Sequence, residues 1–250
     1  MTAAKPIERP ILASDPPANR NEVVVKLEGV TKTYQRDRIA VNALAGVDLE
    51  IRKGDFAVLV GPSGSGKTTL LNLIGGLDTP TSGRILVGGA DIGRMSKSEL
   101  SRLRLRQIGF VFQEFNLIPV LSAIENVEFI MLLQGRPDAQ RRERSMALLK
   151  ALGLEGLEDR RPNELSGGQQ QRVAVARALA AEPIIVLPDE PTANLDSTAG
   201  AALMDMMRRL NEERAATFVF STHDPMVVER ARRVIRLRDG RIEADERRSS

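Results

Sequence analysis

The sequence of 250 residues contains no cysteine and only one histidine, His223. Without cysteine, neither disulfide bonds nor thiolate metal ligands can hold the fold. This composition suits a reducing compartment. A single histidine also excludes a metal centre that depends on several histidines.

Long apolar runs are missing as well. No uninterrupted apolar stretch approaches the roughly 20 residues that a helix needs to cross a bilayer. The first twenty residues, MTAAKPIERPILASDPPANR, are proline-rich and lack the apolar run of a signal peptide. We expect residues 1–21 to form a flexible tail. If the protein works at a membrane, another chain must supply the span.

Charge of one sign is not concentrated anywhere along the chain. The formal net charge is only +3, and lysine and arginine are interspersed with acidic residues. Charge therefore does not imply a nucleic-acid partner. With 42% apolar and 28% charged residues, the composition is that of a folded globular domain. We expect one domain over residues 22–244, followed by a fraying C-terminal tail at 245–250.

The apolar segments that are present predict an α/β fold. Two segments alternate between apolar and polar residues, which predicts a small antiparallel sheet: VVVKLEGV (23–30) and VDLEIRKGD (47–55). Further apolar runs predict strands separated by helix-length stretches: FAVLV (56–60), IGFVF (108–112), IIVL (184–187), TFVFS (217–221) and RVIRLRDG (233–240). This pattern is typical of a mainly parallel sheet. Between residues 114 and 163 helical periodicity dominates, which indicates an inserted helical lobe.

A glycine-rich segment follows the buried strand FAVLV. GPSGSGKTT (61–69) fits the pattern G-x-x-x-x-G-K-[ST] and opens a helix, as phosphate binding requires. Backbone N–H groups and the helix N-terminus would form a cup for a polyphosphate. Lys67 would reach the β- and γ-phosphates, and Thr68 would ligate Mg²⁺. The candidate ATP-binding residues here are Gly61, Ser63, Gly64, Ser65, Gly66, Lys67, Thr68 and Thr69.

Two adjacent carboxylates end another apolar strand, in IIVLPDEP (184–191). Ligands of an open parallel sheet gather beyond the carboxyl ends of its strands, so this pair is expected beside the phosphate loop. Asp189 would be compensated by magnesium and its water shell. Glu190 would accept a proton from the water that attacks the γ-phosphate. Alternatively, the pair forms only a turn or a helix cap.

The segment ELSGGQQQR (164–172) resembles the signature motif of ATP-binding cassette (ABC) proteins. The resemblance runs from Val23 to Ile242, and the other family motifs follow in order: Tyr34, Gln113 in FVFQE, the acid pair, ANLD (193–196) and His223 in FSTHDP. It implies the ABC ATPase fold, a P-loop NTPase core with an N-terminal antiparallel β subdomain and an inserted helical lobe. It also implies hydrolysis of ATP to ADP and phosphate.

The signature also has a physical interpretation of its own. Ser166, Gly167 and Gly168 precede a helical run, so they form a second helix N-terminus that can receive an anion, although such a segment is often only a cap. The resemblance implies that this segment closes over ATP bound by the opposite subunit of a head-to-tail dimer. Asp196 would line the subunit interface.

Further roles are implied by matching positions in the family. Gln113 would contact magnesium and the attacking water and would sense the helical lobe. His223 would hydrogen-bond the γ-phosphate. Tyr34 would stack on adenine, although one aromatic after a strand could simply pack. The resemblance thus implies Mg²⁺ as the cofactor, held by Thr68, Gln113 and, through water, Asp189.

One residue departs from the family pattern. The position before the acid pair is usually small, and here it is Pro188. Proline cannot donate a ladder hydrogen bond and is rare within central strands. We therefore expect the sheet pairing to end by Leu187, with Pro188 already in the loop.

The resemblance implies a separately encoded membrane permease as partner and a peripheral location on the cytoplasmic face of the inner membrane. The segment 114–127 would contact it through Phe115, Leu117, Ile118 and Leu121, unless these only pack the lobe. LNLIGGLDTPTSG and THDPMVVERARRVIRLRDG resemble the subgroup for lipoprotein release, macrolide efflux and mechanotransmission. VFQEFNLIP is shared with amino-acid importers, which remain an alternative. Soluble cassette proteins are a further one, but the chain lacks their long coiled coil and their second cassette.

Overall fold

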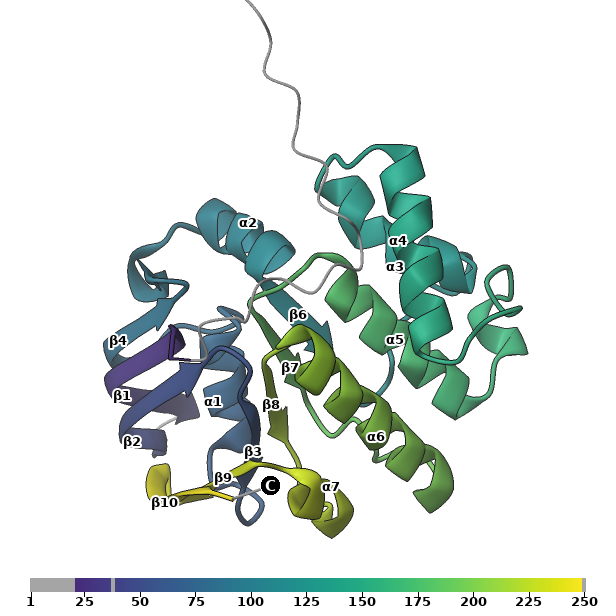
Figure 1. The fold of residues 1–250 in the computed structure, drawn as a ribbon. Coiled ribbons are helices and arrows are strands. Elements are labelled where there is room, and N and C mark those ends of the chain that lie inside the picture. Colours follow the sequence, from purple (N-terminus) through teal and green to yellow (C-terminus); the bar gives the residue numbers. More distant parts are fainter. Residues whose placement is uncertain (1–20, 37–38, 249–250) are drawn as a thin grey trace, which may run out of the picture.

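The computed structural model describes residues 21–36 and 39–248, so the N-terminal tail expected at 1–21 lies almost wholly outside the described residues (Figure 1). The elements are β1 (Val23–Arg36), β2 (Ile39–Arg52), β3 (Phe56–Val60), α1 (Lys67–Ile74), β4 (Ser82–Val87), β5 (Ala90–Asp91), η1 (Ile92–Arg94), α2 (Lys97–Gln107), β6 (Ile108–Val111), α3 (Ala123–Leu133), α4 (Asp138–Ala151), η2 (Pro162–Glu164), α5 (Gly167–Ala180), β7 (Ile185–Pro188), α6 (Ser197–Arg214), β8 (Phe218–Ser221), α7 (Pro225–Arg230), β9 (Arg233–Arg238) and β10 (Arg241–Arg247). None of the helices among these residues combines the length and the apolarity that a bilayer crossing requires.

The central sheet has six strands in the order β10-β9-β3-β8-β7-β6. Neighbouring strands from β9 to β6 run parallel, and only the β9–β10 hairpin is antiparallel. All five residues of β3 are buried. Phe56, Val58 and Val60 pack into one core, whereas Ala57 and Leu59 pack into the other. Burial on both faces explains the continuous apolar run and confirms the predicted parallel sheet.

A second, antiparallel sheet has the order β2-β1-β4-β5. Its β1 and β2 pair with Leu27 opposite Leu49 and Val30 opposite Val47, and all four side chains are buried. The same core contains the apolar residues of α1 and the Ala57 face of β3. Helix α1 therefore packs against both sheets, and the predicted N-terminal β subdomain is confirmed (Figure 1).

The helical lobe is formed by α3 and α4, which pack on α5 beyond the edge of the central sheet (Figure 1). Helix α3 begins at a capping box in which Ser122 accepts from the N–H of Glu125 and the Glu125 carboxylate accepts from the N–H of Ser122. The buried Asn126 amide accepts from the N–H of Ile118 and donates to the carbonyl groups of Ile118 and Leu121. One polar side chain thus fixes the loop that enters the lobe.

The expectation that Pro188 lies in the loop is wrong. Pro188 is the last residue of β7 and pairs with Val111 of β6. The N–H groups of Val186 and Glu190 donate to Thr217 and Ser221 on the β8 side, so residue 188 between them also faces β8 with its nitrogen. The missing donor of proline therefore interrupts only the β7–β8 ladder, and the β6 side stays paired.

The expectation that the chain frays from residue 245 is also wrong for residues 245–247. Strand β10 continues to Arg247, which pairs with Arg233 of β9. The charged side chains that suggested fraying are paired instead: Asp245 binds Arg233, and Arg247 binds Asp55. Ion pairs with the core thus hold this segment in the sheet.

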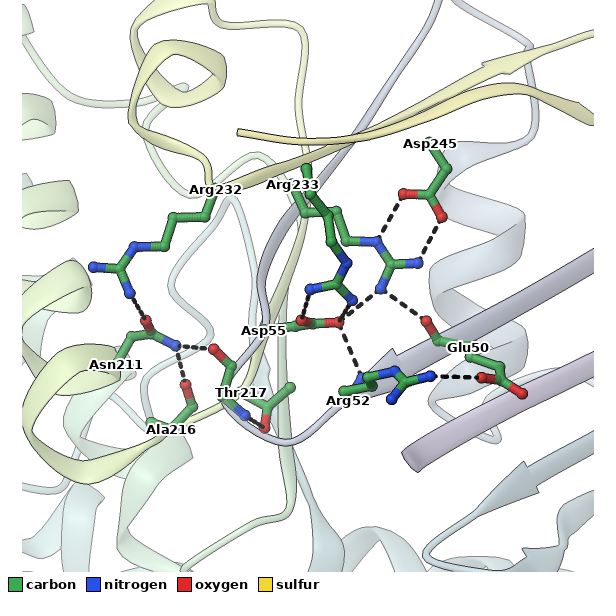
Figure 2. A network of polar contacts seen from close by, with 11 residues as sticks. Glu50, Arg52, Asp55, Asn211, Ala216, Thr217, Arg232, Arg233 and Asp245 are labelled. Carbon is green, nitrogen blue, oxygen red and sulfur yellow. Dashed lines mark hydrogen bonds and ion pairs between the residues drawn. The ribbon is translucent and has the colours of Figure 1, made fainter. Parts of the chain in front are cut away.

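These ion pairs belong to a polar network at the amino-terminal edge of the central sheet (Figure 2). Arg233 and Asp55 are both 7% exposed at the side chain and are joined at 2.7 Å. Arg233 also binds Asp245 at 2.6 Å and donates to the carbonyl group of Glu50. Burial alone lowers the pKa of Arg233, but the hydrogen bonds and charges of Asp245 and Asp55 outweigh this effect and raise it. The network ties β3, β9 and β10 to β2.

We expect Asp55→Ala to lower the free energy of unfolding by about 3 kcal/mol, because it leaves the buried Arg233 with one of its two carboxylate partners. Urea denaturation would measure this loss. The matched control is Glu246→Ala, since the Glu246–Arg236 pair is half exposed on both sides and its atoms lie 3.7 Å apart. The control should change the free energy of unfolding by less than about 0.5 kcal/mol. Equal effects of the two variants would contradict a stabilising role of the network.

Candidate nucleotide site

The phosphate loop joins β3 to α1 and needs glycine at two points of close backbone approach. A Cβ on Gly61 would lie 2.1 Å from the carbonyl oxygen of Leu237, and one on Gly66 would lie 2.5 Å from that of Ala43. Gly66 also has φ 105°, which side chains rarely allow. The glycines therefore let the loop pack closely against β9 and β2.

Two polar side chains of this loop point to an anionic ligand. Lys67 donates from Nζ to the carbonyl oxygens of Gly61 and Pro62 at 2.8 and 3.0 Å, so its charge is held over the loop. Ser65 is 2% exposed, and its hydroxyl has no hydrogen-bond partner among the described residues. A buried polar atom without a partner at the helix N-terminus fits a phosphate or its metal ion.

The acid pair is held in place by its own backbone. The N–H of Asp189 donates to Val111 of β6 at 2.9 Å, and the N–H of Glu190 donates to Ser221 of β8 at 2.8 Å. Glu190 has φ 46°, a left-handed conformation that is unusual for a residue other than glycine. Such conformations cluster at functional sites, where the surrounding contacts maintain them.

The Glu190 side chain has one partner for each carboxylate oxygen. His223 Nδ1 lies 2.7 Å from Oε1, and the Thr222 hydroxyl donates to Oε2 at 2.9 Å. The His223 side chain is 78% exposed, so its ring can reach a ligand outside the protein surface. The structure thus brings together two of the three predicted catalytic residues.

The Asp189 side chain is partly buried at this edge. Burial raises the pKa of its carboxyl group and the negative charge of Glu190 adds to this effect, while the Ser221 side chain and the charge of Lys67 oppose it. A carboxylate whose ionised form is disfavoured by its surroundings is suited to a cation. The predicted cation position therefore has a physical basis.

The order of the strands explains why these residues meet. Strands β3, β8, β7 and β6 are neighbours in the sheet and run parallel. Their carboxyl ends therefore lie on one edge. The phosphate loop follows β3, His223 follows β8, the acid pair follows β7 and Gln113 follows β6. Gly61 and His223, which are 162 residues apart in the sequence (223 − 61), thus lie at the same edge.

The predicted trans residues line a different place, a hollow of about 360 Å³ between the start of α5 and the start of α6. Ser166, Gly167, Gly168 and Asp196 all line it, and none of residues 61–69 does. Ser166 caps α5 by accepting from the N–H of Gln169, as the helix-cap interpretation holds. Asp196 caps α6 in the same way. Two helix N-termini thus face one hollow.

Gln113 and Tyr34 lie at the surface. The Gln113 carbonyl oxygen accepts from the side chain of Asn194, which lines the hollow. The loop that contains Gln113 is therefore hydrogen-bonded directly to the wall of the hollow. Tyr34 is 37% exposed, and its hydroxyl donates to Asp78 at 2.8 Å. The amine of Lys32 lies 4.8 Å from the centre of the ring. The ring is therefore not packed in the core, and adenine stacking stays a prediction.

Several side chains that hold the site together were not predicted. Gln171 of α5 is buried and donates to the carbonyl group of Pro191, beside the acid pair. Arg177, six residues further along the same helix (177 − 171), donates to the carbonyl groups of Phe115 and Asn116, both of which have left-handed φ. In the sequence these residues belong to an ordinary amphipathic helix. Thr222 adjoins the predicted His223, and this adjacency was the one signal in the sequence that could have indicated it.

The strand order, the phosphate loop and the acid pair define a P-loop nucleotide-binding protein with an α/β core. A family profile described as ABC transporter matches residues 44–193. A structural match agrees: the dimeric post-hydrolysis state of the ATP-binding cassette MJ0796, bound to ADP and Pi, has a TM-score of 0.82 and 45% identity, with coverage of 90% of this chain and 99% of that one. The chain belongs to the ATP-binding subunits of the ABC transporter family.

Curated relatives agree with this family. An uncharacterized ABC transporter ATP-binding protein of Thermotoga maritima is 47% identical over 225 residues, which is 90% of this chain and 96% of that protein. The lipoprotein-releasing system ATP-binding protein LolD 1 of Rhodopseudomonas palustris is 48% identical over 88% of this chain and 98% of its own length. The macrolide export ATP-binding/permease protein MacB of Brucella melitensis is 48% identical, but the chain spans only 34% of it.

We expect Asp189→Asn to unfold at a higher temperature than wild type at pH 7, without nucleotide or magnesium. A raised pKa means that the folded state holds the proton more tightly than the unfolded chain, so ionisation of Asp189 opposes folding at neutral pH. The difference should shrink as the pH falls below the raised pKa and should vanish below the ordinary value of 3.8, because only there is the carboxyl group largely protonated in both states. Thermal denaturation at several pH values would measure it.

The exposed Asp159 provides the control, since Asp159→Asn removes the same charge from the surface. A lower unfolding temperature for Asp189→Asn than for wild type at pH 7 would contradict the assignment.

Proposed function

We propose that this chain binds ATP with Mg²⁺ and hydrolyses it, and that hydrolysis powers a separate membrane permease. The observation that carries the proposal is the shared carboxyl edge, where the phosphate loop, the Glu190–His223 pair and the partly buried Asp189 follow neighbouring strands. A phosphate cradle beside a cation-binding carboxylate and a second, positioned carboxylate is the set of parts that phosphoryl transfer to water requires.

In this proposal Lys67 and the loop amides bind the phosphates, and Tyr34 stacks on adenine. Thr68, Gln113 and, through water, Asp189 hold Mg²⁺, which supplies charge neutralisation on the phosphates. No group of three or more His, Cys, Asp or Glu side chains in the described part of the chain could hold a metal alone. This fits magnesium that enters with the nucleotide and keeps water ligands.

Glu190 is the general base in this proposal. It accepts the proton of the attacking water, and the water oxygen forms a bond to the γ-phosphorus as the bond to the ADP oxygen breaks. His223, bound to the other oxygen of the same carboxylate at 2.7 Å, contacts the γ-phosphate and keeps Glu190 oriented. Gln113 orients the water beside the cation.

Two copies form a head-to-tail dimer with ATP between them. Each ATP is bound by the phosphate loop of one copy and by Ser166, Gly167 and Gly168 of the other, while Asp196 lines the interface. The hollow at these residues supports this, because it presents two helix N-termini and contains no residue of the phosphate loop. The matching cassette MJ0796 was itself solved as a dimer with ADP and Pi.

The permease belongs to the efflux, lipoprotein-release or mechanotransmission type, as relatives named LolD and MacB suggest. The chain then lies peripherally on the cytoplasmic face of the inner membrane, and no nucleic acid takes part. The segment 114–127 is the permease contact. Of the four residues predicted for this contact, Leu117 packs against the lobe core, and Phe115, Ile118 and Leu121 are half-buried. Their neighbour Val120, which was not predicted, is 72% exposed and is available to a partner.

We expect Glu190→Gln to reduce ATP turnover by about a hundredfold or more, because a neutral amide cannot accept the proton. ATP binding should persist, and the unhydrolysed nucleotide should hold the dimer together. A phosphate-release assay and size-exclusion chromatography with MgATP would measure both effects. Glu213→Gln, an exposed carboxylate on α6, is the control that should behave as wild type. Wild-type turnover in Glu190→Gln would remove Glu190 from its role.

A second substitution tests whether the nucleotide is shared. Ser166→Arg, added to Glu190→Gln, should abolish the ATP-dependent dimer but leave ATP binding to the single copy unchanged. Ser98→Arg on the exposed surface of α2 is its control. A dimer that persists in the Ser166→Arg variant would show that the hollow is not part of the interface.

We expect the chain to co-purify with an integral membrane protein when it is captured from detergent-solubilised membranes of its own cells. A permease with a large extracytoplasmic domain would support the efflux and lipoprotein-release type. Co-purification with a substrate-binding protein would favour an importer instead. Capture of ribosomes or DNA without any membrane protein would contradict the transport proposal.

A further inference from the structure

Thr222 is a buried residue at the centre of the carboxyl edge. It directly follows β8, the strand between β3, which carries the phosphate loop, and β7, which carries the acid pair. Its side chain is fully buried, and its N–H donates to Leu59 of β3 at 3.3 Å. The position of its backbone is therefore fixed by a hydrogen bond to the central sheet.

The hydroxyl of Thr222 has a defined direction. It accepts from the N–H of Asp224 at 3.0 Å and lies 2.9 Å from Oε2 of Glu190, to which it donates. Because the Asp224 N–H can only donate, it occupies a lone pair of the hydroxyl oxygen and leaves the hydroxyl proton for the carboxylate. The Asp224 carboxylate accepts from the Thr192 hydroxyl at 2.9 Å, and this second contact keeps the Asp224 N–H in place.

Glu190 needs such support. Its left-handed backbone conformation, with φ 46°, is costly for a residue with a side chain. His223, its other partner, is 78% exposed and free to follow a ligand. If His223 moves, the hydroxyl of Thr222 is the partner that still fixes the carboxylate, since it is buried and bound to the backbone at Asp224.

We infer that Thr222 is a positioning residue for the hydrolytic step. Its buried hydroxyl donates to Oε2 of Glu190 and thereby fixes the orientation of the carboxylate. This rests on the proposed function, in which Glu190 takes the proton of the attacking water. Thr222 itself touches neither water nor nucleotide. It acts through the orientation of Glu190, so its loss should lower turnover and leave nucleotide affinity unchanged.

The test compares Thr222→Val with Thr222→Ser. Valine has the same shape as threonine without the hydroxyl, and serine keeps the hydroxyl. A hydrogen bond to a charged group is worth enough to change kcat about ten- to a hundredfold, so Thr222→Val should lose turnover on this scale with KM for ATP unchanged. Thr222→Ser should stay within about threefold of wild type, as one retained hydrogen bond predicts.

Thr217→Val is the matched control. Thr217 is buried immediately before the same strand β8, and its hydroxyl accepts from the N–H of Gly54 at the opposite edge of the sheet. The same substitution there removes a buried hydroxyl and lowers stability without touching Glu190, so kcat should remain that of wild type. An equal loss of kcat in Thr217→Val and Thr222→Val would overturn the inference.

The substitution is then repeated in the Glu190→Gln background, with single-turnover measurements of the residual rate. If Thr222 acts through the carboxylate, Thr222→Val should have little further effect there. A full further loss would show that Thr222 serves the turn at Asp224 instead. Wild-type turnover in Thr222→Val alongside an inactive Glu190→Gln would overturn this inference alone, whereas wild-type turnover in Glu190→Gln would overturn the proposed function.

Discussion

The parallel pairing of β3, β8, β7 and β6 is the constraint on which the site depends. Parallel neighbours bring their carboxyl ends to one edge, so each loop that leaves this edge starts from a position fixed by ladder hydrogen bonds. The backbone contacts of Asp189 and Glu190 continue these ladders beyond the strands. The reactive groups are therefore placed by the backbone of the sheet, and their side chains need only short-range contacts to complete the arrangement.

The opposite edge of the same sheet is fixed by charge. Asp55, just before β3, and Arg233, the first residue of β9, are both buried and paired, and Asp245 and Arg247 bring β10 into the same network. Thr217, just before β8, accepts from the N–H of Gly54, and Asn211 of α6 donates to the Gly54 carbonyl group. Firm attachment at the amino edge allows the carboxyl edge to carry loops with left-handed residues and partly buried carboxylates, which are unfavourable on their own.

Helix α5 connects the two proposed parts of the nucleotide site, which are the hollow at its own N-terminus and the acid pair at the carboxyl edge. Its N-terminus lines the hollow, its Gln171 binds the backbone beside the acid pair, and its Arg177 binds the strained residues after Gln113. It also packs against α3 and α4 of the lobe. A nucleotide that contacts Gly167 and Gly168 would therefore act on one helix that reaches the proposed base, the proposed cation ligand and the proposed permease contact.

The sequence by itself determined the strand and helix types, the phosphate-loop motif and most of the residues proposed for the site, because apolar periodicity and short motifs are local properties of the chain. It failed at Pro188 and at residues 245–247. Whether a proline fits a strand depends on which neighbour its nitrogen faces, and whether a charged end is ordered depends on partners such as Asp55, far away in the sequence.

Only the tertiary structure decided which partner each polar group has. Thr222 and Arg177 are ordinary residues in the sequence, and they become part of the site because the sheet order brings Glu190 and Phe115 to them. Hydrogen bonds act over about 3 Å, whereas the chain separates these groups by tens of residues. Local patterns encode which elements form, and only their packing determines which side chains meet.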